Sequence, residues 1–285
     1  MKRTILAALF VAAAALPGLM AQKGNQKEAA AQGSQPKGPM PKSKGEQDAL
    51  VAMFNAQQKP DDLIAAAEEL LTKYADTDFK DAALLMEANA YQQKGDADKA
   101  QLYAERALAA NPKNFQASLM LSETIAQHTR ENDLDKDEKL TRAEKYGNDT
   151  IANLAAAGKP NPQLTDQQWG DIKKDLTAQA HDALGMAALA RKKYDLAITE
   201  FKAAVDGMVQ PQPAYEVRLA SAYNSAGKYD EAIATADKVM GEAQTPTQIK
   251  QVAQSIRAGA TVAKQKAAGQ SGTPPAPPQV EIKKP

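Results

Sequence analysis

Apolar residues between positions 46 and 266 recur every three or four residues, in runs of about a dozen residues or more. That spacing places the apolar side chains on one face of a helix, so it predicts amphipathic α-helices. The strongest helix breakers fall between the runs, at Pro60, Gly95, Pro112, Gly158 to Pro162, Gly227 and Pro246. Short helices joined by tight turns pack as antiparallel neighbours. The pattern therefore predicts an all-α fold built from helical hairpins.

The helical pattern also repeats with a period of about 34 residues. Residues 81–114, 178–211 and 213–246 align by residue type, with a small residue nine positions after the end of each first helix: Ala100, Ala197 and Ala232. Small residues within the first helices allow the two helices of a hairpin to approach closely: Ala88, Gly185 and Ala220. Larger residues fill the space between hairpins, as close packing requires: Leu84, Tyr91, Phe201 and Tyr223.

This helix–turn–helix unit resembles the tetratricopeptide repeat. Residues 81–114 match it best, and 178–211 and 213–246 match it well; residues 47–80 match less closely but lie one repeat length upstream. The resemblance implies a right-handed superhelical stack of hairpins in a repeat domain spanning 46–266. It also implies that the first helix of each unit lines a concave face, and that a protein or peptide segment binds there.

One unit departs from the pattern, and a last helix follows the repeats. Residues 115–177 form an elaborated unit, with helices expected over about 115–129 and 139–157, separated by a polar insertion. A long helix is expected over 165–190, leading into the next unit. Residues 247–266 are expected to form a capping helix, with four apolar residues facing inward: Ile249, Val252, Ile256 and Val262.

The first 21 residues have the features of a secretory signal peptide. Lys2 and Arg3 precede twelve unbroken apolar residues, and Ala21 follows at a position suited to cleavage. Twelve helical residues rise only about 18 Å, less than the roughly 30 Å hydrocarbon core of a bilayer. The sequence therefore predicts an exported chain, periplasmic or extracellular, with an uncleaved anchor as the alternative. No later segment is apolar enough to predict a transmembrane helix in the mature chain.

Both ends of the repeat domain are expected to be disordered. Residues 22–45 carry five lysines and one glutamate with almost nothing to bury, so they predict a basic linker. Residues 267–285 contain four closely spaced prolines and predict an extended tail. Lysine plus arginine equals aspartate plus glutamate at 35 each, which gives no reason to expect nucleic acid as a partner.

No grouping of residues predicts catalysis or a cofactor. There is no cysteine, which excludes disulfides and thiol chemistry, and the two histidines fall in different units. His181 is expected to be partly buried and structural, whereas His128 ends a helix, where a cation suits the helix dipole. Trp169 is expected to pack the long helix against the elaborated unit, with an exposed partner anchor as the alternative. We therefore expect a protein that is not an enzyme.

Four acidic residues follow the spacing of a calcium-binding loop: Asp133, Asp135, Asp137 and Glu144. The sixth residue of such a loop must turn sharply, but here it is Glu138 instead of glycine. The same run also has acidic residues at the expected start of a helix, where the dipole favours them. A helix start is the favoured interpretation, and a calcium site is the alternative.

Polar residues on the first helices predict where a partner binds. Asn55, Asn89 and Glu123 fall at identical offsets 34 residues apart, and further members of this set lie on the same expected face: Gln58, Gln92, Arg218, Ser221 and Asn224. Amide side chains bond a partner's backbone without demanding a charge. The alternative is that these residues only keep the repeats soluble. Asp182 and Met186 stand where a clamp for acidic peptide tails requires lysine and asparagine, which disfavours such a partner.

The sequence thus predicts an exported scaffold that mediates protein–protein or protein–peptide interaction in the cell envelope. The alternative is an accessory protein of the envelope that is tethered to membrane or cell wall through the basic linker, since lysines near an anionic surface each contribute roughly 1 kcal/mol. Self-association is also compatible with the open surface that a repeat stack leaves.

Overall fold

The computed structural model describes residues 39–270, and every regular element in that range is an α-helix. The eleven helices are α2 (Lys44–Asn55), α3 (Pro60–Lys73), α4 (Lys80–Gln93), α5 (Ala97–Ala110), α6 (Phe115–His128), α7 (Lys136–Ala156), α8 (Asp166–Ala190), α9 (Tyr194–Gly207), α10 (Pro213–Ser225), α11 (Tyr229–Gly241) and α12 (Thr247–Gln270). They pair into five hairpins, and α12 packs against α10 and α11. The prediction of an all-α stack of hairpins is confirmed.

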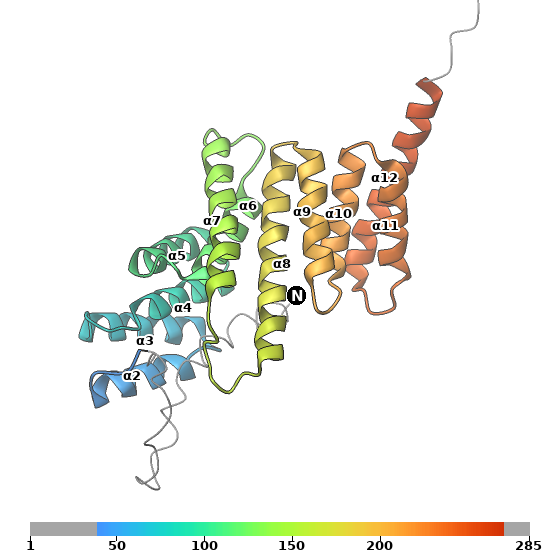
Figure 1. Ribbon diagram of the computed structural model, residues 1–285. Helices are drawn as coiled ribbons and strands as arrows, with labels where there is room; N and C mark the ends of the chain where they lie inside the picture. The colour runs from blue at the N-terminus through green and yellow to red at the C-terminus, as the bar shows by residue number, and fades with distance from the viewer. Residues whose placement is uncertain (1–38, 271–285) are drawn as a thin grey trace, which may run out of the picture.

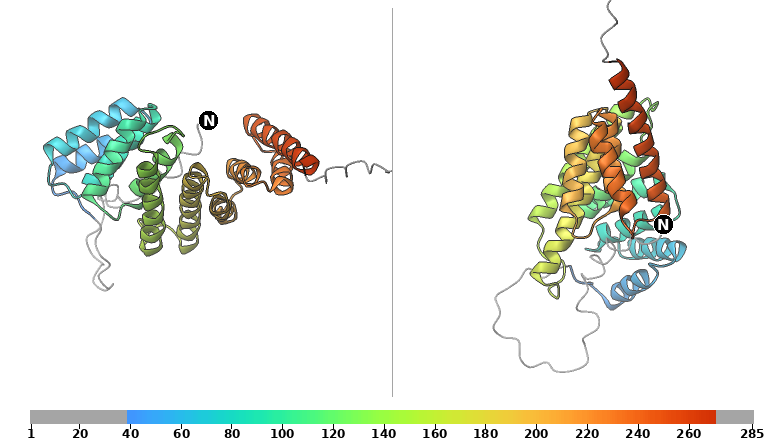
Figure 2. Two further views of the ribbon diagram at one scale, coloured as in Figure 1. Left: turned by 90° about the horizontal axis from the view of Figure 1, so that it is seen from above. Right: turned by 90° about the vertical axis from the view of Figure 1, so that its right-hand side faces the viewer.

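The hairpins lie side by side along a curved path (Figure 1). Seen from above, the helices follow an arc from α2 to α12, and the direction of the helix axes changes between the first two hairpins and the later ones (Figure 2). Each helix contacts the next along the chain, and α6 also contacts α8. The first helices of the hairpins are α2, α4, α6, α8 and α10, and we call the surface that they line the first-helix side.

Small residues set the distance between the helices of a hairpin. Ala88, Ala100, Ala220 and Ala232 are all fully buried. At Gly185 of α8 a Cβ atom would lie 2.6 Å from Cδ1 of Phe201 of α9, whose side chain is also fully buried. The aromatic ring therefore fills the space beside Gly185 within the hairpin, in addition to the predicted space between hairpins, where it packs with Leu219 and Ala222 of α10.

Three hairpin turns have the same backbone geometry. Gly95 and Gly227 adopt φ angles of 77° and 74°, and Lys192 stands at the equivalent place with φ 60°. In each turn the amide of the following residue donates to a carbonyl near the end of the first helix, at 2.9–3.0 Å: Asp96 to Tyr91, Lys193 to Ala188 and Lys228 to Tyr223. Lys192 thus has the left-handed backbone conformation that glycine has in the other two turns.

Replacing Lys192 with glycine should raise the free energy of unfolding by about 1 kcal/mol, because the left-handed conformation penalises a side chain but not glycine. The ion pair of Lys192 with Glu131 is exposed on both sides and contributes little. Urea denaturation followed by circular dichroism measures the change. The matched control is Lys202→Gly, in the interior of α9, which should lose about 1 kcal/mol because glycine is a poor helix former. Equal losses in both variants would contradict the explanation.

The elaborated unit is held together by a separate apolar cluster. Trp169, near the start of α8, is 5% exposed and packs with residues of α6, α7 and α8: Leu119, Leu154, Leu176 and Ala180. Its ring lies 6.5 Å from that of Phe115, centroid to centroid. Thr165 caps α8 through a capping box, so the long helix begins where the sequence predicted. Trp169 is therefore a packing residue, and the alternative of an exposed anchor is wrong.

The folded region extends beyond the predicted bounds at both ends. Ser43 caps α2, which begins at Lys44, and Lys42 pairs with Asp76 and Asp78 at 3.3 Å. The last residues of the predicted basic linker are therefore ordered, because Lys42 and Ser43 have partners in the first hairpin. At the other end α12 continues to Gln270, into the segment predicted as a tail. The predicted signal peptide, most of the linker and residues 271–285 lie outside the described residues.

The buried face of α12 differs from the prediction. Ala253 and Ala260 are fully buried, with Ile249 and Ile256 packed beside Ala253 and Val239. Val252 and Val262, predicted to face inward, are 47% and 65% exposed. The helix packs along the row 249, 253, 256, 260, because alanines let it lie close to α10 and α11.

Candidate functional site

The predicted binding residues lie on the first-helix side with one exception. Asn55 is the exposed last residue of α2, while Gln58 lies in the turn before α3. The prediction that Gln58 belongs to a first helix is wrong, since α2 ends three residues earlier than the repeat offset assumed. Asn89 and Gln92 are half-buried on α4, and the Asn89 amide donates to the Leu85 carbonyl at 2.9 Å.

A true cluster forms further along, where α6, α8 and α10 lie next to one another. Arg218 of α10 donates from Nη1 to Oδ2 of Asp182 of α8 at 2.7 Å. Its guanidinium also lies over the ring of Tyr215, 5.7 Å from the centroid. The Asp182 side chain is 5% exposed and that of Arg218 33%. The Asp182 side of the ion pair is therefore buried, and the Arg218 side is partly exposed to solvent.

Glu123 of α6 completes this arrangement. Leu119, one turn earlier on α6, packs with Leu176 and Ala180 of α8, so Glu123 falls level with Asp182 of the parallel helix. Glu123 is half-buried. We call Glu123, Asp182, Tyr215 and Arg218 the first-helix polar cluster.

Burial raises the pKa of both acids in the polar cluster. Burial, reinforced by the Asp182 carboxylate, raises the pKa of Glu123 to about 8 although Arg218 opposes the shift. Burial also raises the pKa of Asp182 to about 6, against the direct pairing with Arg218. The pKa of Tyr215 is raised by burial and by the nearby Asp182 and Glu123. At neutral pH the cluster therefore holds one ion pair and one protonated carboxyl group.

Sequence reasoning found half of the cluster. It selected Glu123 and Arg218, together with Ser221 and Asn224, which are half-buried on α10. It missed Asp182 as a site residue and did not consider Tyr215. The signal available was the spacing of 36 residues between Asp182 and Arg218, one repeat plus half a turn, which places them on adjacent first helices.

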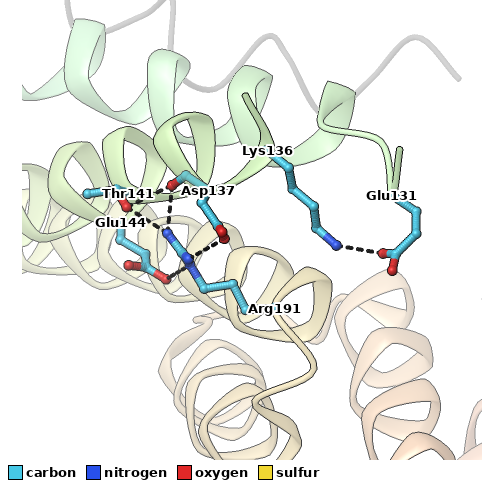
Figure 3. Close-up of polar contacts among 6 residues, drawn as sticks. All are labelled: Glu131, Lys136, Asp137, Thr141, Glu144 and Arg191. Atoms are coloured by element: carbon cyan, nitrogen blue, oxygen red, sulfur yellow. Dashed lines mark hydrogen bonds and ion pairs between the residues drawn. The ribbon is translucent and has the colours of Figure 1, made fainter. Parts of the chain in front are cut away.

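The acidic run considered for calcium belongs to a helix start and to ion pairs. Arg191, at the end of α8, donates to Oδ1 and the backbone carbonyl of Asp137, each at 2.8 Å, and to Glu144 at 2.9 Å (Figure 3). Lys139 pairs with Asp133 and Asp135 at 3.0 and 2.9 Å. Because α7 begins at Lys136, this backbone cannot wrap around an ion, and the calcium alternative is wrong.

The same contacts fix the elaborated unit to the next one. Glu131, in the insertion after α6, pairs with Lys136 at 2.6 Å and with Lys192 of the α8–α9 turn at 3.0 Å. These two lysines lower the pKa of Glu131 to about 2. Arg191 adds a bond to Thr141 at 2.6 Å (Figure 3). Ion pairs and hydrogen bonds from the polar insertion and from α7 to the end of α8 and the α8–α9 turn thus connect the third hairpin to the fourth.

The two histidines have the structural positions predicted for them. His181 is partly buried, and its Nδ1 lies 2.7 Å from a carboxylate oxygen of Glu200 of α9. His128 is exposed at the end of α6, with Nδ1 2.8 Å from the carbonyl of Thr124. They lie in different hairpins, as the sequence indicated.

Comparison with known proteins agrees with this architecture. Residues 82–114, which span α4 and α5, match the family model of the tetratricopeptide repeat. The structure is similar to that of a thermophilic tetratricopeptide repeat protein from Thermus thermophilus, with a TM-score of 0.50 and 20% identity, over 74% of this chain and 98% of that one. No curated protein sequence matches the chain significantly.

Two further solved structures are similar over most of their length. One is the assembly chaperone of RpL4 (Acl4), at 12% identity and a TM-score of 0.45, over 79% of this chain and 99% of that one. The other is a tetratricopeptide repeat protein from Parabacteroides merdae ATCC 43184, at 17% identity and a TM-score of 0.39, over 81% and 94%.

The chain therefore carries a tetratricopeptide-type fold, with one repeat that matches the family model directly. That fold suggests a scaffold for protein–protein interaction, and proteins of this kind are generally not enzymes. Within residues 39–270, no helix combines the length and the apolar character that crossing a bilayer requires.

Proposed function

We propose that this protein is an exported scaffold of the cell envelope that binds a protein or peptide segment on its first-helix side. The observation that carries the proposal is the first-helix polar cluster, which brings groups from three consecutive hairpins to one partly exposed place. Arg218 is a third exposed, and Oδ1 of the buried Asp182 has no hydrogen-bond partner among the described residues. Charged and hydrogen-bonding groups that packed helices hold in fixed positions are suited to binding polar groups of a partner.

Binding on the first-helix side can be tested by site-specific photo-crosslinking in the native cell. A photo-reactive amino acid at Asn89 or Ser221 reports on the first helices, and one at the exposed Lys202 of α9 is the matched control on a second helix. We expect the same covalent adduct from the two first-helix positions and none from Lys202. An adduct of twice the chain's own mass would identify the partner as a second copy. Equal crosslinking from all three positions would contradict a binding side.

Export rests on the apolar segment that follows Lys2 and Arg3. Intact mass spectrometry of the chain purified from cell fractions tests it. We expect a mature chain that begins at Gln22 and is found outside the cytoplasm. A full-length chain that begins at Met1 and is found in the cytoplasm would contradict the envelope role, but it would not contradict the role as a scaffold. A full-length chain retained in the membrane fraction would support the uncleaved anchor.

A further inference from the structure

The first-helix polar cluster contains more acidic than basic side chains. Glu123, Asp182 and Arg218 form its core, and Asp175 of α8 is close enough to Tyr215 to act on it electrostatically. Two acidic side chains, one from α6 and one from α8, therefore lie within electrostatic range of one guanidinium from α10. Arg218 is directly paired with Asp182, so its charge is already neutralised.

One carboxylate oxygen in the cluster lacks a partner. The Asp182 side chain is 95% buried and uses Oδ2 for Arg218, whereas Oδ1 has no hydrogen bond among the described residues. A buried, ionised oxygen without a donor costs free energy until a donor reaches it. Glu123 lies within electrostatic range of Asp182 and is only half-buried, so it forms the solvent-exposed edge of this acidic pair.

We infer that the first-helix polar cluster is the subsite for a cationic side chain, lysine or arginine, of the bound protein segment. The inference rests on the proposed function and names the chemistry of its partner. An ammonium or guanidinium group would donate to Asp182 Oδ1 and to Glu123, and Tyr215 would contact its aliphatic stem. An acidic partner is disfavoured, because the only cation of the cluster is committed to Asp182.

A cation bound in the cluster favours the ionised form of Glu123. The charged groups that act on Glu123 are Asp182 from α8 and Arg218 from α10, and Tyr215 of α10 lies within electrostatic range of Glu123. Free Glu123 is protonated at neutral pH, because burial and Asp182 raise its pKa, and a bound cation lowers that pKa again. Binding therefore releases up to one proton. The affinity rises with pH, by up to about tenfold per pH unit, and levels off near pH 8, where Glu123 of the free protein ionises.

Selection from a phage-displayed library of twelve-residue peptides against the full chain tests the inference. We expect selected peptides to share a lysine or arginine at one fixed position. Replacing that residue with norleucine should weaken binding at least tenfold in calorimetry. Selected peptides without a common basic residue would overturn the cationic subsite while leaving the scaffold in place. A chain that selects no peptide above background would overturn both this inference and the proposed function.

Two variants make the result specific to the cluster. Glu123→Gln keeps the shape of the side chain, so it should fold like the wild type while losing the preference for a basic residue and the release of a proton. Calorimetry in buffers of different ionisation enthalpy measures that release. Glu138→Gln, on the exposed first turn of α7, is the matched control and should bind like the wild type. Unchanged proton release in Glu123→Gln would overturn the assignment.

Discussion

Replacing Glu87 with glutamine should stabilise the protein by about 3 kcal/mol at pH 8 and leave its stability nearly unchanged at pH 4. Glu87 of α4 is fully buried, and neither of its carboxylate oxygens has a hydrogen-bond partner among the described residues. Burial, reinforced by Glu68, raises the pKa of Glu87 to about 7 against the weak influence of Arg106. The wild type therefore contains a buried glutamate that destabilises the folded protein when it ionises.

The direction of the pH effect follows from this raised pKa. The folded protein holds the Glu87 proton up to about pH 7, whereas the unfolded chain releases it near 4.5. The stability that the retained proton of Glu87 contributes to the folded protein is fully present below pH 4.5 and is lost as the pH rises through 7. Glutamine cannot ionise, so the variant escapes the loss. Urea denaturation at both pH values measures the difference between the two proteins.

The control for this prediction is an exposed glutamate on the neighbouring helix. Glu69 of α3 pairs with Lys73 at 2.5 Å, and both side chains are more than half exposed. Glu69→Gln should change stability by no more than about 0.5 kcal/mol, because exposed ion pairs contribute little. An effect of Glu87→Gln that is the same at pH 4 and pH 8 would show that the carboxyl group does not change its charge in this range.

The hairpins were predictable because their signals are local. Gly95 and Gly227 mark turns that need a positive φ, and Thr165 marks a helix start, so helix type and order follow from the sequence. Alanine is the residue at which this reasoning becomes ambiguous. On α12 the buried row consists of Ala253 and Ala260 between isoleucines, and an assignment by side-chain size selects the valines instead.

The polar cluster was only half predictable, because acids are expected at the surface. Asp182 and Glu87 are buried at helical positions that a sequence pattern assigns to apolar side chains. Whether such a residue finds a partner depends on a helix one repeat away. Arg218 reaches Asp182 across that distance, whereas Glu87 has no such partner among the described residues. Repeat spacing predicts which helices are neighbours, but the pairing depends on side-chain reach and burial.

Replacing Gly185 with alanine should lower the free energy of unfolding by about 2 kcal/mol. The added Cβ would lie 2.6–3.0 Å from three ring atoms of the fully buried Phe201, and overpacking of this kind costs about 3 kcal/mol. The higher helix propensity of alanine offsets only about 1 kcal/mol of that cost. Chemical denaturation monitored by circular dichroism measures the loss.

Two further variants separate the steric explanation from a backbone effect. Gly170 lies on the same helix, α8, and nothing lies within 4 Å of its missing Cβ, so Gly170→Ala should gain up to about 1 kcal/mol. In a Phe201→Leu background, itself destabilised, the smaller side chain leaves room at position 185. There Gly185→Ala should be neutral or stabilising, and this coupling is the signature of direct contact. If Gly185→Ala lowers the free energy of unfolding equally with phenylalanine and with leucine at position 201, the close approach of α8 to α9 does not depend on a missing Cβ.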